Sequence, residues 1–331
     1  MRWRFCSGLE AGFFCLTTLA SLAFAATDPA ATDGAATTAT DGKPAASTQS
    51  LAVAGVNVRL DFLDTAFGHG TDPIVAWIER SVEIVAGYYG RFPQTQLRIR
   101  VSLSDGGGVR GGTAYGTSVP LIRLRIGRDV TAAELRDDWI LVHEMVHLAL
   151  PDVGRAHAWL SEGLATYVEG IARAQAEHRA PADVWAEYVR AMPRGLPQAG
   201  DQGLDHTHTW GRTYWGGALF CLLADVEIRS RTDNRFGLRD ALRAVLQSSG
   251  GLVSDWPIVR VLATGDAAVG TTVLRDLYAQ MKDAPVTPDL AALWKRLGIE
   301  RNGASVDLRD DAPLAAIRDA IMRMEEEADS G

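Results

Sequence analysis

The segment His143-Glu144-Met145-Val146-His147 decides how the rest of this 331-residue chain is interpreted. Residues four apart on a helix lie on one face, so the two imidazoles can bind the same metal ion. The glutamate between them projects beside that ion, where a bound water needs a general base. The pattern therefore predicts a hydrolytic site with one Zn2+ per chain, in which His143 and His147 are ligands and Glu144 is the base.

The residues around this motif predict one helix that runs from Thr131 to the proline at position 151. Thr131 and Glu134 form a capping-box pattern, in which each side chain satisfies a backbone amide at the helix start. Apolar residues then recur at helical spacing, at Leu135, Trp139, Val142, Val146 and Ala149. Two histidines without partners would be costly in so apolar a helix, which favours a metal. A satisfied core histidine is the alternative for either one alone.

A catalytic zinc usually keeps three protein ligands and one open position for water. The strongest candidate for the third ligand is Glu162, within the string Trp-Leu-Ser-Glu-Gly-Leu-Ala-Thr-Tyr-Val-Glu at residues 159–169. The buried stripe of a second helix is marked by Leu160, Leu164, Val168 and Ile171. A short turn at residues 151–158 would fold this helix back onto the first and present Glu162 to the histidines. The alternative is a first-turn carboxylate favoured by the helix dipole.

These two segments resemble the active-site helices of the gluzincin metallopeptidases, whose zinc ligands are two histidines and a glutamate. The string at residues 159–169 is similar to the Trp-Leu-Asn-Glu-Gly-Phe-Ala-x-Tyr-x-Glu element of the large zinc aminopeptidases and the related glycyl aminopeptidases. The resemblance implies that Glu162 is the third ligand and that Glu169 supports the ligands without binding the metal. It is strong over residues 131–230. Only fourteen residues separate His147 from Glu162, which is fewer than in the aminopeptidases.

A third helix is predicted to begin within residues 209–218 and to be apolar on all sides up to Ala224, as expected at the centre of a domain. Gly216 and Gly217 would let another backbone approach it closely. In the resembling families a tyrosine just before such a helix donates a hydrogen bond to the oxyanion, and Tyr214 holds that position. An aromatic packing role is the alternative. Arg212 is expected to be solvated.

Two further features have open interpretations. His206 and His208 lie in a polar loop, where they are inert, help to stabilise the transition state or bind a second metal. The glycine-rich residues 105–116 lack the Lys-Ser/Thr ending of a phosphate-binding loop. In the resembling aminopeptidases such a stretch is an edge strand along the cleft, and its glutamate captures the substrate's amino terminus. This chain has the glycines without an acidic residue, so aminopeptidase and endopeptidase activity both stay open. A plain hairpin loop is the alternative.

Composition bears on the compartment and the partners. Residues 1–25 have a basic start, an apolar core and the ending Ala23-Phe24-Ala25, which indicate a secretory signal too short to span a membrane. Residues 26–50 are rich in Ala, Thr, Asp and Ser, which predicts a disordered linker or propeptide. The mature chain is thus expected to be periplasmic or secreted. A net charge of −8 without a basic run gives no reason to expect a nucleic acid or a membrane as partner.

The remaining pattern predicts an α+β fold. Residues 51–130 form a sheet-containing subdomain, with alternating strands at 56–62, 97–103 and 122–126 and a helix from Pro73 to Tyr89. Residues 131–331 form a helical zinc-binding subdomain, in which Cys221 is buried. A small, twisted, mainly antiparallel sheet beside this half agrees with the thermolysin-like architecture that the resemblance implies. The expected function is an exported zinc peptidase acting on peptides or proteins. The alternative is a non-catalytic zinc-binding or scaffold protein on a peptidase fold, and the oligomeric state stays open.

Overall fold

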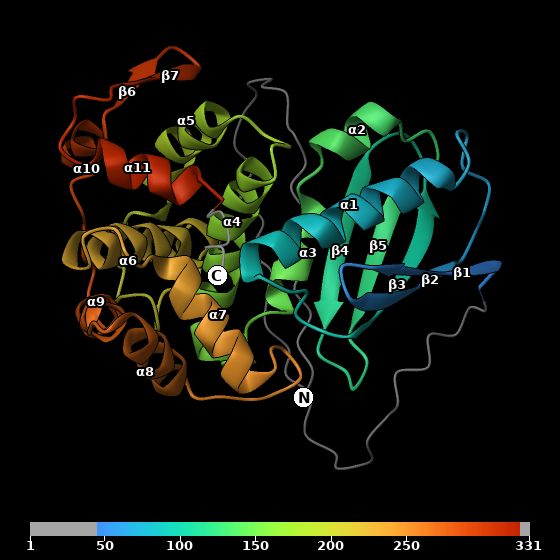
Figure 1. The fold of residues 1–331 in the computed structure, drawn as a ribbon, viewed down its shortest axis with the longest axis horizontal. Coiled ribbons are helices and arrows are strands. Elements are labelled where there is room, and N and C mark those ends of the chain that lie inside the picture. The colour runs from blue at the N-terminus through green and yellow to red at the C-terminus, as the bar shows by residue number, and fades with distance from the viewer. Residues whose placement is uncertain (1–44, 325–331) are drawn as a thin grey trace, which may run out of the picture.

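The computed structural model describes residues 45–324, so the predicted signal peptide and most of the predicted linker lie outside the described residues. A five-stranded sheet stands beside a helical half, which makes the fold mixed α/β (Figure 1). The strand order is β1-β2-β3-β5-β4. The strands are β1 (Ser47–Val53), β2 (Val56–Phe62), β3 (Gln96–Ser104), β4 (Val109–Tyr115) and β5 (Leu121–Gly127).

Helices make up most of the rest of the described chain. Those nearest the predicted site are α1 (Asp72–Tyr89), α2 (Ala132–Asp137), α3 (Ile140–His147), α4 (Ala158–Gln175) and α6 (Gly217–Arg231). Around them lie α5 (Pro181–Ala191), α7 (Leu238–Ser249), α8 (Ile258–Val269), α9 (Val273–Met281), α10 (Leu290–Leu297) and α11 (Ala315–Met322). The predicted helical half also contains a hairpin of β6 (Ile299–Asn302) and β7 (Ser305–Leu308). None of the helices within residues 45–324 has the length and apolar character needed to cross a membrane.

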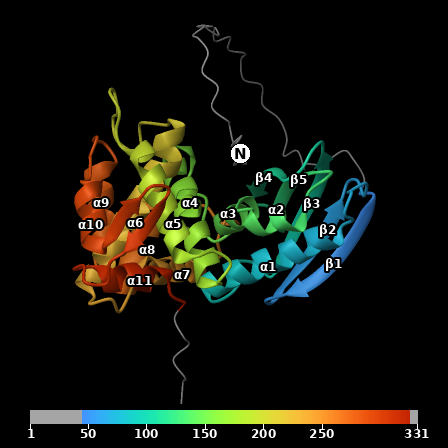
Figure 2. The ribbon, with the colours of Figure 1, turned by 90° about the horizontal axis from the view of Figure 1, so that it is seen from above.

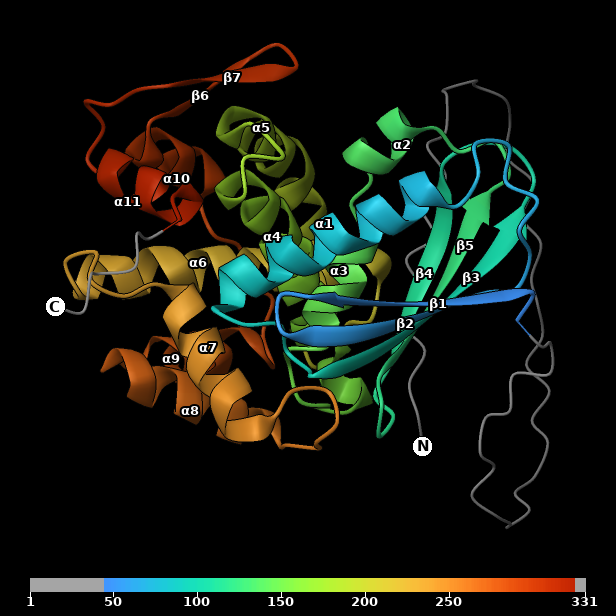
Figure 3. The same ribbon diagram turned by 45° about the vertical axis from the view of Figure 1, so that its right-hand side comes forward.

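The sheet is mixed, so the expectation of a mainly antiparallel sheet is wrong. β1–β2 and β4–β5 pair antiparallel, whereas β2–β3 and β3–β5 pair parallel. For β2 and β3 the reason is α1, which lies across one face of the sheet and connects them (Figure 1 and Figure 3). A crossover through a helix returns the next strand in the same direction, unlike a hairpin. For β3 and β5 the reason is that β4 runs antiparallel at the edge between them in the chain, so that β5 returns in the direction of β3. The strands keep the predicted positions, and their inward residues are buried.

The predicted linker of residues 26–50 ends earlier than expected, because β1 begins at Ser47. β1 pairs with β2 from Ser47↔Phe62 to Val53↔Val56. The connecting residues Ala54 and Gly55 have φ values of 45° and 77°, which a two-residue hairpin turn of this type requires. Composition does not reveal this strand because residues 47–50 are polar and mostly exposed. Backbone pairing with β2, rather than burial, orders them.

The segment before the metal motif folds as two helices rather than the predicted one. The capping box is present, since Thr131 Oγ1 accepts a hydrogen bond from the Glu134 amide at 3.2 Å and the Glu134 carboxylate accepts from the Thr131 amide at 2.8 Å. The helix then stops at Asp138, whose ψ of 139° is extended. Asp138 Oδ1 accepts from the Ile140 amide at 2.9 Å. Such a local bond competes with helix continuation and starts α3 separately.

The centre of the helical half is the close crossing of α4 and α6. A Cβ atom on Gly163 would lie 2.2 Å from the Cα of Gly217, and one on Gly217 would lie 1.9 Å from the carbonyl oxygen of Trp159. Only glycine permits this approach, so the prediction of a close backbone contact at Gly217 is confirmed. Cys221 on α6 is a buried free cysteine, as expected.

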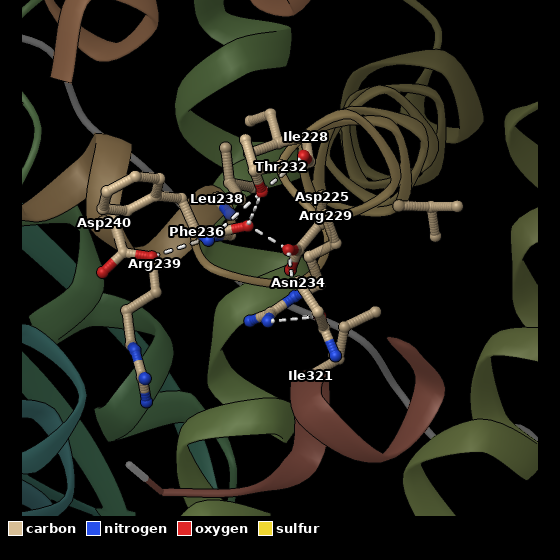
Figure 4. Close-up of polar contacts among 12 residues, drawn as sticks. Asp225, Ile228, Arg229, Thr232, Asn234, Phe236, Leu238, Arg239, Asp240 and Ile321 are labelled. Atoms are coloured by element: carbon tan, nitrogen blue, oxygen red, sulfur yellow. Dashed lines mark hydrogen bonds and ion pairs between the residues drawn. The ribbon is translucent and has the colours of Figure 1, made fainter. Parts of the chain in front are cut away.

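A buried aspartate joins α6 to its neighbours. The carboxylate of Asp225 accepts hydrogen bonds from the hydroxyl of Tyr167 on α4 at 3.0 Å and from Nε of Arg229 at 2.9 Å. It also accepts from the amide of Leu238 at the start of α7 at 3.0 Å, and the last two partners are drawn in Figure 4. A buried carboxylate needs such partners. The network therefore fixes α4, which carries Glu162, against α6 and α7.

Candidate active site

Two histidines and a glutamate meet where α3 packs against α4 (Figure 2). One ligand atom from each of His143, His147 and Glu162 can be chosen so that all lie within 4.8 Å of one another, and all three side chains are buried. Nε2 of His143 is 3.2 Å and Nε2 of His147 is 3.6 Å from the same Oε2 of Glu162. Zinc–ligand bonds of about 2.0–2.2 Å in a tetrahedron place ligand atoms about 3.3–3.6 Å apart. The donor set and its spacing therefore fit zinc.

The electrostatics of this cluster favour a cation. Burial alone would raise the pKa of Glu162, but His147 and His143 hold that pKa at about 2, so the carboxylate is ionised. Burial alone would lower the pKa of His147, but the Glu162 carboxylate outweighs burial and raises the pKa. The ionised Glu162 carboxylate thus stabilises a positive charge on the buried His147, and such a site is suited to a divalent metal ion.

Ser161 is a residue of the site that the motif by itself did not identify. Its Oγ lies 2.9 Å from Nδ1 of His147. A partner on the second ring nitrogen orients a ligand histidine, and here it turns Nε2 toward Glu162. The signal was present in the sequence, since Ser161 directly precedes Glu162 where the resembling element has an asparagine.

Glu144 is fully buried and reaches from α3 to the edge strand β4. Its Oε2 accepts a hydrogen bond from the backbone amide of Ala114 at 2.8 Å. A Cβ atom on Gly112 would lie 2.7 Å from Cγ of Glu144, so a glycine is needed for β4 to approach α3. The glycine-rich stretch is therefore an edge strand, as the resemblance implied, and the plain-loop alternative is wrong.

Tyr214 lies beside the His-His-Glu cluster, in the π-helical turn η3 (Arg212–Gly216). Its ring is stacked on that of His143, with centroids 6.3 Å apart and an interplanar angle of 19°. The ring of Trp210 stacks on it at 5.7 Å. Single π-helical turns are rare and often occur at functional sites. The fold thus brings the tyrosine singled out in the sequence to the histidines.

The expectation that Arg212 is solvated is wrong. Its side chain is 2% exposed, its Nε lies 2.7 Å from Oδ2 of Asp201, and its Nη1 donates to the carbonyl of Gly195 at 2.6 Å. The π-helical turn directs the guanidinium under the loop at residues 195–201, where a paired carboxylate compensates for lost hydration. Arg212 therefore anchors the turn that carries Tyr214.

The other singled-out residues lie outside the three-residue cluster. The Glu169 carboxylate is buried on α4, with Oε2 3.6 Å from Nη1 of Arg173, and burial raises its pKa to about 7. His206 pairs with Asp283 at 2.9 Å in an exposed position, and His208 is exposed as well. Within the described residues, neither histidine belongs to a group that could hold a metal.

Comparison with known proteins adds evidence on the fold. No protein-family model matches the sequence, and a search of curated proteins finds no match. An aminopeptidase N family protein from Idiomarina loihiensis matches in structure with a TM-score of 0.58 at 14% identity, over 76% of this chain and 49% of that chain. An M1 zinc metallopeptidase from Deinococcus radiodurans gives a TM-score of 0.48 at 18% identity, over 75% and 52%. The chain thus spans about half the length of these proteins.

The match to the Idiomarina protein shows a shared fold. This chain has the mixed α/β fold of an aminopeptidase N family protein, with a buried His-His-Glu cluster. The resemblance to the gluzincin aminopeptidase group is therefore confirmed at the level of the fold.

Proposed function

We propose that this chain is a zinc-dependent peptidase that hydrolyses peptide bonds in peptide or protein substrates. The observation that carries the proposal is the buried cluster of His143, His147 and Glu162, whose ligand atoms have the spacing of a zinc site. These residues would hold one zinc ion and leave a position for water. When bound, the zinc would polarise the scissile carbonyl and lower the pKa of that water toward neutrality.

Glu144 acts as the general base in this proposal. It takes the proton of the attacking water and later passes it to the leaving amine. Its hydrogen bond to the Ala114 amide supports this role, because it holds the carboxylate at the outer edge of β4, with which no other strand of the described sheet pairs. An extended peptide can add to such an edge as a further strand, which would place its scissile bond next to Glu144.

Tyr214 and Glu169 have assisting roles. The Tyr214 hydroxyl donates a hydrogen bond to the oxyanion, supported by its stacking on His143 and by the Arg212 anchor. Glu169 supports His143 from the side away from the metal. Nδ1 of His143 is buried without a hydrogen-bond partner among the described residues, and the buried Glu169 carboxylate interacts electrostatically with His143, which is the basis for this assignment.

The proposal includes export and architecture. We expect cleavage near Ala25 and a periplasmic or secreted mature protein, because residues 1–25 have the pattern of a secretory signal. We assign the catalytic half to the thermolysin-like type because of its two ligand-bearing helices and glycine-rich edge strand.

Elemental analysis combined with a cleavage assay on unstructured protein tests the proposal. One zinc per chain, with activity lost to a chelator and restored by zinc, would support it. Stoichiometric zinc without turnover on any peptide would favour the non-catalytic zinc-binding protein. Free and N-acetylated peptides then separate the two kinds of peptidase, since only an aminopeptidase needs a free amino terminus.

A further inference from the structure

One face of the sheet carries a set of arginines that come together only in the fold. β2, β3 and β5 alternate between apolar residues on the face covered by α1 and α3 and arginines on the opposite, outer face. The register pairs Arg59 with Arg98, and Arg100 with Arg123. We call this side of the sheet the arginine face. Its cations are Arg59, Arg98, Arg100, Arg123 and Arg125, of which Arg100 is buried and the other four are partly or fully exposed.

The positive charge of the arginine face is strongest toward β4. At the other side, Asp61 accepts hydrogen bonds from Nε of Arg59 at 2.9 Å and Nε of Arg98 at 2.7 Å, which offsets part of their charge. Asp61 is the only acidic residue at the outer positions of the five described strands. In a chain of net charge −8, this concentration of cations is a local exception.

Both arginines of β5 reach across to β4, the edge strand of the candidate active site. Cζ of Arg123 lies over the ring of Tyr115, 5.0 Å from its centroid. Nη2 of Arg125 donates a hydrogen bond to the carbonyl of Arg110 at 3.1 Å. Tyr115 directly follows Ala114, whose amide contacts Glu144. Two guanidinium groups therefore lie along the strand that borders the general base.

We propose that Arg123 and Arg125 select acidic polypeptides as substrates, an inference that rests on the proposed peptidase function. A peptide paired with the free edge of β4 turns every second side chain toward the arginine face. Neighbouring strands are about 4.8 Å apart, so a glutamate there comes within reach of a guanidinium that already extends over β4. The planar guanidinium is well suited to a carboxylate, and the basic face raises the local concentration of acidic segments.

The test compares kcat/KM on two peptides that are identical except that the glutamates flanking the cleaved bond are replaced by glutamine. The wild-type protein should prefer the glutamate peptide by about fivefold at low salt, the size of a favourable exposed ion pair, and salt should reduce the preference. Arg123→Gln and Arg125→Gln should each lower the ratio of kcat/KM for the glutamate peptide to that for the glutamine peptide, and the double variant should bring this ratio to one. Arg309→Gln, an exposed arginine beyond β7, is the control and should keep the wild-type ratio.

Three outcomes would overturn the inference. Equal kcat/KM for the two peptides in the wild-type protein would do so while leaving the peptidase proposal intact, because both peptides are cleaved. If neither is cleaved, fluorescence anisotropy measures their binding to the zinc-loaded protein. Tighter binding of the glutamate peptide, lost in the double variant, would support the selection by arginine, and equal binding would overturn it. Binding to phosphatidylglycerol vesicles without a preference between the peptides would also overturn it and assign the face to a membrane surface.

Discussion

Replacement of Gly112 by alanine tests whether β4 positions the general base. The new Cβ would lie 2.7 Å from Cγ of Glu144 and 3.0 Å from Cγ2 of Ile140. Carbon atoms in contact are ordinarily about 3.5–4.0 Å apart, so either β4 or the Glu144 side chain must move by about 1 Å. Overpacking of this kind costs about 1–3 kcal/mol of stability. Because the three ligand side chains do not touch Gly112 closely, zinc should stay bound.

The main effect should be on catalysis. A misplacement of about 1 Å at a reacting group can lower the rate by about a hundredfold. We therefore expect Gly112→Ala to lower kcat/KM by about that factor, with wild-type zinc content and a melting temperature lower by about 2–8 °C. Peptide hydrolysis, elemental analysis and a thermal melt measure the three quantities.

Gly107→Ala is the matched control in the same glycine-rich segment. Its Cβ would meet Oε1 of Glu134 at 2.6 Å, so the exposed Glu134 carboxylate must turn and weaken its capping-box bond to the Thr131 amide at the start of α2, which leaves Glu144 untouched. Activity close to wild type is expected for this variant. Full activity of Gly112→Ala would refute the positioning of Glu144 by β4. Loss of zinc from Gly112→Ala would refute it too, because the substitution would then act on the ligands.

Four further predictions follow from the site and its supports. Glu144→Gln should keep zinc and lose nearly all hydrolysis; a fully active variant would contradict its role as base. His147→Ala should lose the metal, so unchanged zinc by elemental analysis would remove it from the ligand set. Arg212→Met leaves Asp201 buried without its cation and should lower the free energy of unfolding by about 3–5 kcal/mol in a urea titration; a change below about 1 kcal/mol would show that the pair is not structural. Burial raises the pKa of Glu169 to about 7 in the folded protein. Ionising this carboxyl therefore lowers the free energy of unfolding as pH rises from the ordinary pKa of a glutamate through 7. Zinc-free Glu169→Gln should therefore gain stability relative to the wild type between pH 5 and pH 8, and a constant difference across that range would contradict the buried carboxyl.

Several elements could be predicted because their signals are local. The strands at 56–62, 97–103 and 122–126 follow from period-two alternation, and α1 and α4 follow from helical spacing of apolar residues. The two histidines of α3 could be predicted as a pair because residues four apart on a helix lie on one face, and the resemblance supplied Glu162 on α4 as the third member of the cluster.

Other features could not be predicted because they depend on partners far along the chain. The polar strand β1 is ordered by hydrogen bonds to β2. The parallel pairing of β2 with β3 follows from the path of α1, and that of β3 with β5 from the place of β4 at the sheet edge. The break at Asp138 depends on a local side-chain hydrogen bond that competes with continuation of the helix. The sequence around Arg212 predicts a solvent-exposed side chain, but the π-helical turn brings that side chain to the buried carboxylate of Asp201.

The sequence by itself determined that His143 and His147 share one face of a helix, because their four-residue spacing on α3 sets the direction of both side chains. The packing of α4 against α3 decided that Glu162 meets them. Only the tertiary structure decided what surrounds these three residues. The contact of Ala114 with Glu144 requires β4 to reach the sheet edge beside α3. The arginines at 59, 98, 100, 123 and 125 form no basic run, because apolar residues alternate with them. Strand pairing, which joins residues remote in sequence, gathers them on one face beside the candidate active site.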